Sequence, residues 1–83
     1  MEDDIPVSDR LLLIMHNLCA VRPEIARTST ELAEGLSMAA ENVVGILSRF
    51  EGEGYVQSLV DQNGQKKFYL TGRGILKVCS SFT

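Results

Sequence analysis

The chain has 83 residues, of which 45% are hydrophobic and 23% are charged, and its net charge is −3. This size suits a single domain spanning residues 1–83, in which residues 1–7 could form a disordered acidic lead-in. The composition excludes a disordered tail, a collagen-like repeat and a disulfide-built mini-protein. The longest apolar run, Leu11 to Met15, is too short to cross a membrane, and the acidic start is unlike a secretory signal. We therefore expect a cytoplasmic domain with no membrane association.

The first expected helix follows Pro6, and either Ser8 or Asp9 is expected to cap it. Five successive apolar residues then pass round the whole circumference of this helix, and Leu18 and Cys19 continue the apolar spacing. A surface helix with one buried face needs only a narrow apolar stripe. Helix 8–20 is therefore either central to the core, or covered by the domain on one side and by a second copy of the chain on the other.

Two further helices are expected after the break at Pro23. The run Thr28-Ser29-Thr30-Glu31 matches a capping box and predicts the start of the second helix. Gly35 is expected near its end, in the left-handed conformation. The third helix is expected over residues 38–52, with Gly52 and Gly54 ending it. Its inward set is Met38, Val43, Ile46 or Leu47, and Phe50.

A β-hairpin and a last helix complete the chain. Strands are expected over 55–60 and 65–70, joined by Asn63-Gly64, a strong signal for a type I′ turn. Alternation places Phe68 and Leu70 on one face of the second strand. The last helix, 73–82, has an apolar stripe formed by Ile75, Val78 or Cys79, and Phe82.

The expected elements carry a set of motifs: Glu31-Leu32-Ala33-Glu34, Val43, Leu47, Phe50, Glu51-Gly52-Glu53-Gly54-Tyr55-Val56 and Tyr69-Leu70-Thr71-Gly72-Arg73-Gly74. With these motifs, the order of elements resembles a winged helix-turn-helix domain. Its motifs are similar to those of the MarR-type and ArsR-type transcriptional regulators of bacteria and archaea. The resemblance implies an α+β, mainly helical fold: a three-helix bundle, a two- to three-stranded β-hairpin wing and a C-terminal helix.

By resemblance, the chain is expected to be a double-stranded DNA-binding transcriptional regulator. Helix 38–52 would read the major groove, and the wing at 61–67 would contact the flanking backbone. The same helix residues could instead be a solvated surface, and the wing lysines could serve to protect a sheet edge. The expected DNA-contacting residues are Ala40, Glu41, Asn42, Gly45, Ser48, Arg49, Gln65, Lys66 and Lys67.

The charge distribution supports a second hypothesis. Residues 28–55 hold five glutamates and one arginine, whereas residues 56–83 hold four basic residues and one aspartate. Glu41 suits the start of a helix, but in a DNA groove it would repel phosphate unless it accepted a hydrogen bond from cytosine. Val44 and Gly45 make the same surface apolar and small. These features favour a protein-binding winged-helix adaptor module without DNA affinity as the alternative.

Partners and chemistry follow from the remaining residues. A homodimer is expected through helices 8–20 and 73–82, because the first has more apolar circumference than one core can use and the second adds its apolar stripe. No cofactor, metal or catalytic arrangement is evident, so enzyme activity is not expected. His16 is expected to be a packed or hydrogen-bonded side chain. Cys19 and Cys79 are expected to be small buried side chains, or a redox pair if their helices lie together.

Overall fold

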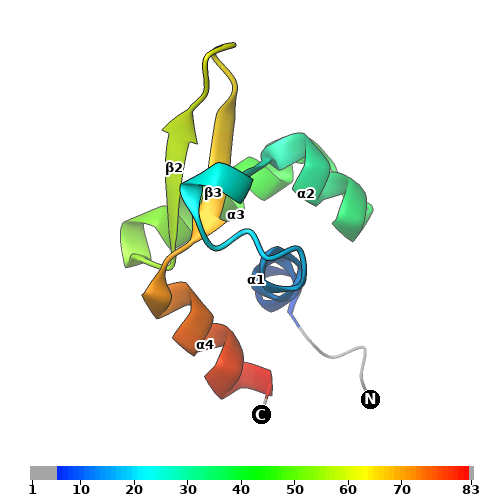
Figure 1. Ribbon diagram of the computed structural model, residues 1–83. Coiled ribbons are helices and arrows are strands. Elements are labelled where there is room, and N and C mark those ends of the chain that lie inside the picture. Colours follow the sequence, from blue (N-terminus) through cyan, green and yellow to red (C-terminus); the bar gives the residue numbers. More distant parts are fainter. Residues whose placement is uncertain (1–5, 83) are drawn as a thin grey trace.

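The computed structural model describes residues 6–82, with side chains described as far as residue 80. Four α-helices pack against a small sheet, and the hairpin projects from this body (Figure 1). This architecture confirms the expected α+β, mainly helical, winged-helix fold. In chain order the elements are α1 (Val7–Asn17), the 3₁₀ turn η2 (Pro23–Ile25), β1 (Arg27–Thr28), α2 (Ser29–Leu36), α3 (Ala40–Glu53), β2 (Val56–Val60), β3 (Lys66–Leu70) and α4 (Gly72–Phe82).

The sheet has three antiparallel strands in the order β1-β3-β2. Its register pairs Val56 with Leu70 at the base of the hairpin and Val60 with Lys66 near the tip. The short strand β1 pairs Arg27 with Phe68, so the segment that precedes α2 is more than a connection. Val56, Phe68 and Leu70 are buried on the face that covers the core, which confirms the expected alternation along β3.

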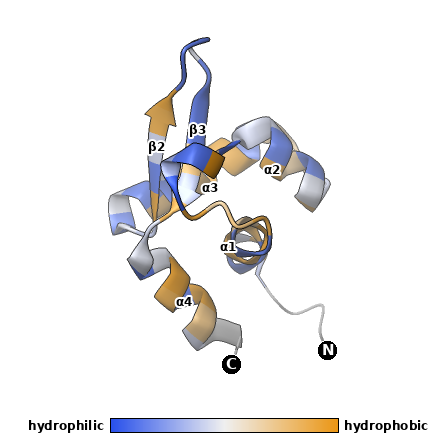
Figure 2. Cartoon of the chain, in the orientation of Figure 1, coloured by the Kyte–Doolittle hydropathy of each residue, from blue (hydrophilic) through white to orange (hydrophobic). Residues whose placement is uncertain are grey.

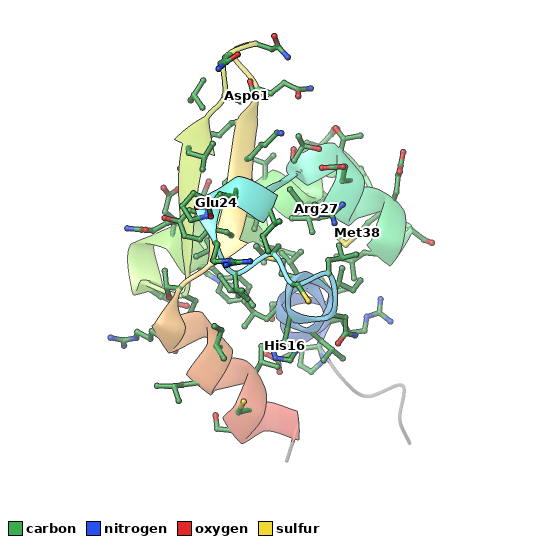
Figure 3. The ribbon with its side chains drawn as sticks, viewed as in Figure 1. His16, Glu24, Arg27, Met38 and Asp61 are labelled. Carbon is green, nitrogen blue, oxygen red and sulfur yellow. The ribbon has the colours of Figure 1, made fainter. Side chains whose placement is uncertain are left out.

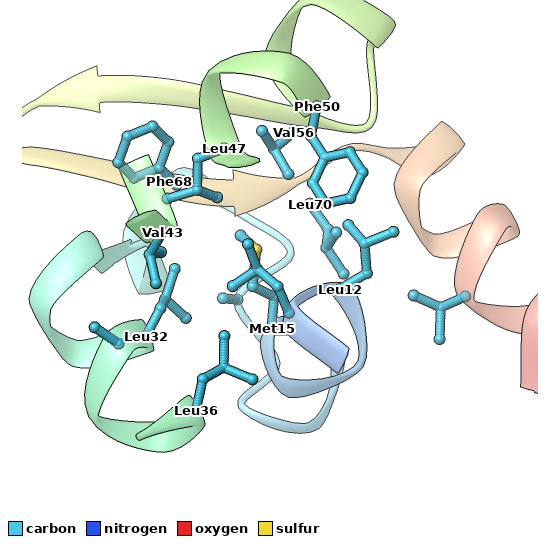
Figure 4. Packing of buried hydrophobic residues seen from close by; sticks show 14 residues of the cluster. Leu12, Met15, Leu32, Leu36, Val43, Leu47, Phe50, Val56, Phe68 and Leu70 are labelled. Atoms are coloured by element: carbon cyan, nitrogen blue, oxygen red, sulfur yellow. The ribbon is translucent and has the colours of Figure 1, made fainter. Parts of the chain in front are cut away.

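The core fills the space between the sheet and the four helices (Figure 4). Three side chains of α1, Leu11, Leu12 and Met15, are fully buried, while Leu13 and Ile14 pack only partly against the cluster. Helix α1 is therefore central to the core and still has apolar surface beyond it. The buried residues contributed by the other elements are Ala20, Leu32, Ala33, Leu36, Val43, Leu47, Phe50, Val56, Phe68, Leu70 and Val78.

The start of α2 is the capping box that the sequence predicts. The Glu31 N–H donates to Thr28 Oγ1 at 3.1 Å, and the Thr28 N–H donates to Glu31 Oε1 at 2.9 Å. The expected side-chain cap of α1 is wrong. Helix α1 begins at Val7 after Pro6, with no side-chain hydrogen bond at the cap.

The turns that follow helices α1, α2 and α3 each contain a left-handed residue, but only one of the three is glycine. These residues are Cys19 (φ 58°), Ser37 (φ 57°) and Gly54 (φ 86°). The expected left-handed role of Gly35 is therefore wrong, because Gly35 lies inside α2 against the Ile14 side chain. Likewise, Gly52 lies within α3, and Gly54 alone ends that helix.

The expected burial of the two cysteines is also wrong. Helix α1 ends at Asn17, so Cys19 lies in the turn beyond it and is exposed, and Cys79 is exposed on α4. His16 is exposed in the last turn of α1, not packed among apolar side chains. Sequence periodicity extended α1 by a turn, because Leu18 and Cys19 continue its apolar spacing in a segment that is not helical.

The hairpin loop differs from the expected type I′ turn. That turn requires positive φ at both Asn63 and Gly64, and only Gly64 has it (φ 82°). Instead, the Gly64 N–H donates to the Asp61 carbonyl at 3.0 Å, and the Asp61 N–H donates to the Gln65 carbonyl at 2.9 Å. This is a three-residue loop closed by a left-handed glycine, the second common hairpin geometry.

Candidate nucleic-acid interface

Helix α3 is amphipathic, and its outer surface carries the expected contact residues. Val43, Leu47 and Phe50 are buried, whereas the row on the opposite side is exposed. This outer row consists of Glu41, Gly45, Ser48 and Gly52. Asn42 and Arg49 are exposed beside it, and Ala40 is half-buried at the helix start. The structure thus brings the expected α3 residues together on one exposed surface.

Small side chains leave room along the middle of this surface. A Cβ atom added to Gly45 would have no atom within 4 Å, so nothing in the described chain covers the backbone there. Val44 is 41% exposed on the adjoining flank. A binding partner could therefore approach the α3 backbone closely at Gly45.

The hairpin places its two lysines on opposite faces. Lys66 pairs with Val60 on the face that includes Phe68, which is the side of the sheet covered by α3. Its Nζ lies 5.5 Å from the centroid of the Phe68 ring. Lys67 lies on the other face, half-buried, with its Nζ 3.5 Å from Asp61 Oδ2. Of the two lysines, Lys66 is thus on the α3 side and lacks a carboxylate partner among the described residues.

Asp61 organises the hairpin loop. Figure 3 shows Asp61 near the top of the molecule, in the hairpin, and His16 in its lower part. Its Oδ1 accepts hydrogen bonds from the backbone N–H groups of Asn63 and Gln65, each at 2.9 Å. The hydrogen bond from Gln65 is the main cause of a lowered pKa of Asp61, and Asn63 and Lys67 act in the same direction against partial desolvation. The ionised carboxylate therefore holds the loop and the Lys67 charge together. Gln65 is exposed in this loop.

Side-chain hydrogen bonds fix the base of the hairpin to α3. Ser58 Oγ donates to Glu51 Oε2 at 2.7 Å, which joins β2 to the last turns of α3. On the other face, Tyr69 Oη donates to Gln57 Oε1 at 2.6 Å and links the two strands. The wing and α3 consequently form one surface with a defined relative orientation.

Acidic side chains lie on both α2 and α3. Glu31 pairs with Arg27 at 3.8 Å, and Glu51 is bound by Ser58. Glu34, Glu41 and Glu53 are exposed and have no ion pair within the described part of the chain. The α3 surface is therefore of mixed charge, and its basic residues lie at its C-terminal end and on the wing.

Two open hollows lie away from this surface, between α1 and α2. They have volumes of about 440 and 530 Å³ and share Ile14 and Gly35 in their walls. Leu13 of α1 lines one hollow, and Leu18, just beyond α1, lines the other. The described residues contain no group of three metal-ligating side chains. None of the helices within residues 6–82 is long and apolar enough to span a membrane.

Comparisons with solved structures identify the same fold. MepR, a transcription regulator of the Staphylococcus aureus multidrug efflux pump MepA, superposes with a TM-score of 0.78 over 95% of this chain, at 21% identity. S. aureus MepR has also been solved as a complex with DNA. This chain spans 56% of the MepR chain in the first of these structures, a little over half its length.

Two shorter proteins match over nearly their whole length. A candidate DNA-binding protein of Ralstonia eutropha gives a TM-score of 0.79 at 15% identity, with 95% of this chain and 98% of that chain covered. The DNA-binding TubR fragment from Clostridium botulinum gives 0.75 at 24% identity, with 94% and 98% covered. No protein-family model and no curated sequence matches the chain. At these identities the likeness shows the winged-helix fold.

Proposed function

We propose that this protein is a double-stranded DNA-binding transcriptional regulator acting in the cytoplasm. Helix α3 would enter the major groove, and the wing at 61–67 would contact the flanking backbone. The observation that carries the proposal is the exposed outer surface of α3, joined to a wing whose Lys66 lies on the same side. The DNA-binding proteins that share this fold support it. Binding of this kind requires no catalytic group, metal or cofactor.

The side chains on α3 offer donors and acceptors that suit base edges. Asn42 can make two hydrogen bonds with adenine, and Arg49 can make two with guanine. Glu41 could accept a hydrogen bond from the amino group of cytosine. Gly45 and Ser48 lie between these residues and are small enough for the helix to approach the floor of the groove.

We also propose that the chain acts as a homodimer through α1 and α4. Ile75, Leu76 and Cys79 share one side of α4, and Leu76 is 70% exposed. The apolar colouring of α4 is visible in Figure 2. The half-buried Leu13 adds apolar surface on α1, the helix that packs against α4, and the exposed Leu18 adds apolar surface just beyond its end. A two-fold dimer would present two α3 helices to half-sites about 34–36 Å apart along the DNA.

A titration of labelled mixed-sequence duplex at several salt concentrations tests DNA binding directly. We expect affinity to fall steeply with salt, with a slope of about −0.9 for each phosphate neutralised. Lys66→Gln and Lys67→Gln each remove one charge and form a matched pair. We expect Lys66→Gln to weaken binding more, because Lys67 is already paired with Asp61. Equal losses for the two variants would contradict the proposed orientation of the wing.

The exposed glutamates support one competing function, a protein-binding adaptor. Glu34 and Glu41 are exposed without ion pairs among the described residues, and Val44 gives α3 an apolar patch. A surface of this kind suits a basic or apolar protein partner. The same titration separates the two functions: no binding to any duplex at low salt would exclude the regulator and favour the adaptor.

A further inference from the structure

The start of α4 is fixed to the end of α3 by one threonine. Thr71 Oγ1 donates to the Gly54 carbonyl at 2.6 Å, and the Thr71 N–H donates to the Tyr55 carbonyl at 3.0 Å. The same Oγ1 accepts a hydrogen bond from the Gly74 N–H at 3.0 Å and so caps α4. In Figure 1, the end of α3 and the start of α4 lie on one side of the molecule, at the base of the hairpin.

This junction gathers three cations around two aromatic rings. The Arg73 guanidinium lies 5.6 Å from the centroid of the Tyr55 ring, and Lys77 Nζ lies 5.9 Å from it. The Tyr55 ring meets the Phe50 ring edge-on at 5.8 Å, and the Arg49 guanidinium lies 5.6 Å from the Phe50 centroid. We call these five residues the basic–aromatic cluster.

The positive charge of the cluster is not neutralised within the described chain. None of its three cations has a carboxylate within ion-pair distance among residues 6–80. Glu51, two residues after Arg49 in α3, accepts a hydrogen bond from Ser58 Oγ. Glu53 lies four residues after Arg49 without pairing to it. The aromatic rings hold the cations by contacts of about 0.5–1 kcal/mol each at exposed sites, which leaves their N–H donors available.

We propose that the basic–aromatic cluster is a second backbone-contact site, which binds a DNA phosphate different from the one at the wing. Arg49 belongs to both the cluster and the exposed surface of α3, so the two surfaces are continuous. Val56 pairs with Leu70, so the neighbouring Tyr55 and its cations lie at the Leu70 end of β3. Lys66 is four residues from Leu70 along the strand, about 13 Å, so Lys66 and the cluster are too far apart to neutralise one phosphate. This inference rests on the proposed function, because it enlarges the same DNA interface.

A matched pair of double variants tests this site. Arg73→Gln with Lys77→Gln should weaken binding to the mixed-sequence duplex about tenfold at moderate salt and make the salt slope shallower by about one, the contribution of one phosphate. Arg10→Gln with Arg22→Gln makes the same change in net charge at exposed residues of α1 and the loop after it, and should leave the slope unchanged. Wild-type affinity and slope in the first variant, or equal losses in both, would overturn the proposal.

A second pair of variants tests the site while leaving the cations and aromatic rings of the cluster unchanged. Glu53→Gln removes an exposed carboxylate beside Arg49, and Glu34→Gln removes one from α2. We expect Glu53→Gln to tighten duplex binding two- to threefold more than Glu34→Gln (an order-of-magnitude figure), and equal effects would contradict the site. If the unmodified protein binds no duplex, the proposed function fails. If the unmodified protein binds the duplex, and Lys66→Gln weakens this binding while the Arg73→Gln and Lys77→Gln double variant does not, only the cluster proposal fails.

Discussion

At the scale of single residues, the helix ends show that different residue types can occupy the same left-handed backbone conformation. After α1, the Cys19 N–H donates to the His16 carbonyl at 3.0 Å, and the Ala20 N–H donates to the Met15 carbonyl at 2.9 Å. This paired pattern is the Schellman motif, which satisfies carbonyls that the helix leaves open. The same motif closes α2 at Ser37 and α3 at Gly54. The hydrogen bonds and the burial of Ala20 thus outweigh the cost of a left-handed cysteine.

Cys19→Gly should therefore stabilise the protein. A side chain at φ 58° costs about 1 kcal/mol, of which the greater entropy loss of glycine cancels part. We expect the free energy of unfolding to rise by about 0.5–1 kcal/mol and the thermal midpoint by a few degrees. Thermal unfolding followed by circular dichroism measures this. Cys19→Ser keeps the Cβ and is the control. A glycine variant no more stable than the serine variant would show that position 19 carries no strain.

At the scale of elements, α4 owes its position to a close approach of two backbones. A Cβ atom on Gly74 would collide with the Tyr55 carbonyl oxygen and would lie 2.9 Å from the Leu70 Cδ2 atom. Gly74 thus lets the first turn of α4 sit directly against the end of α3, where Thr71 bonds to Gly54. The threonine and the glycine act together in forming this corner.

Gly74→Ala should destabilise the fold, because backbone atoms cannot move aside as a flexible side chain can. We expect a loss of about 1–3 kcal/mol, the usual range for overpacking, or more. Gly72→Ala is the matched control in the same helix, since its Cβ would have no atom within 4 Å. Chemical unfolding of both variants gives the two free energies. The close approach would be disproved if both alanine variants were equally stable.

At the scale of the whole molecule, the exposed apolar side of α4 carries the dimer proposal. Leu76→Glu changes a side chain that is 70% exposed, so the fold should remain intact while a buried charge would disrupt an interface. We expect the unmodified protein to sediment as a dimer at micromolar concentration and the variant as a monomer. Val60→Glu makes a similar change at a β2 residue that is 65% exposed and should remain dimeric. A monomeric unmodified protein would exclude this interface.

The sequence by itself determined the features that depend on near neighbours. Residues three apart form the capping box at Thr28 and Glu31, and alternate residues divide the two faces of β3. Helical spacing was sufficient to separate the buried Val43, Leu47 and Phe50 of α3 from its exposed candidates. These patterns, with the resemblance they carry, predicted the winged-helix fold and the exposed surface of α3.

Tertiary structure decided what depends on contacts between distant segments. Apolar spacing continues past Asn17, but the buried Ala20, whose carbonyl accepts the Leu70 N–H at 2.7 Å, belongs to a chain that has already turned. The pairing of Lys67 with Asp61 depends on a loop closed by several backbone hydrogen bonds. The basic–aromatic cluster joins residues from α3, the following turn and α4. Local patterns predict which face of an element is apolar, whereas the partner of each side chain is set only when the elements pack.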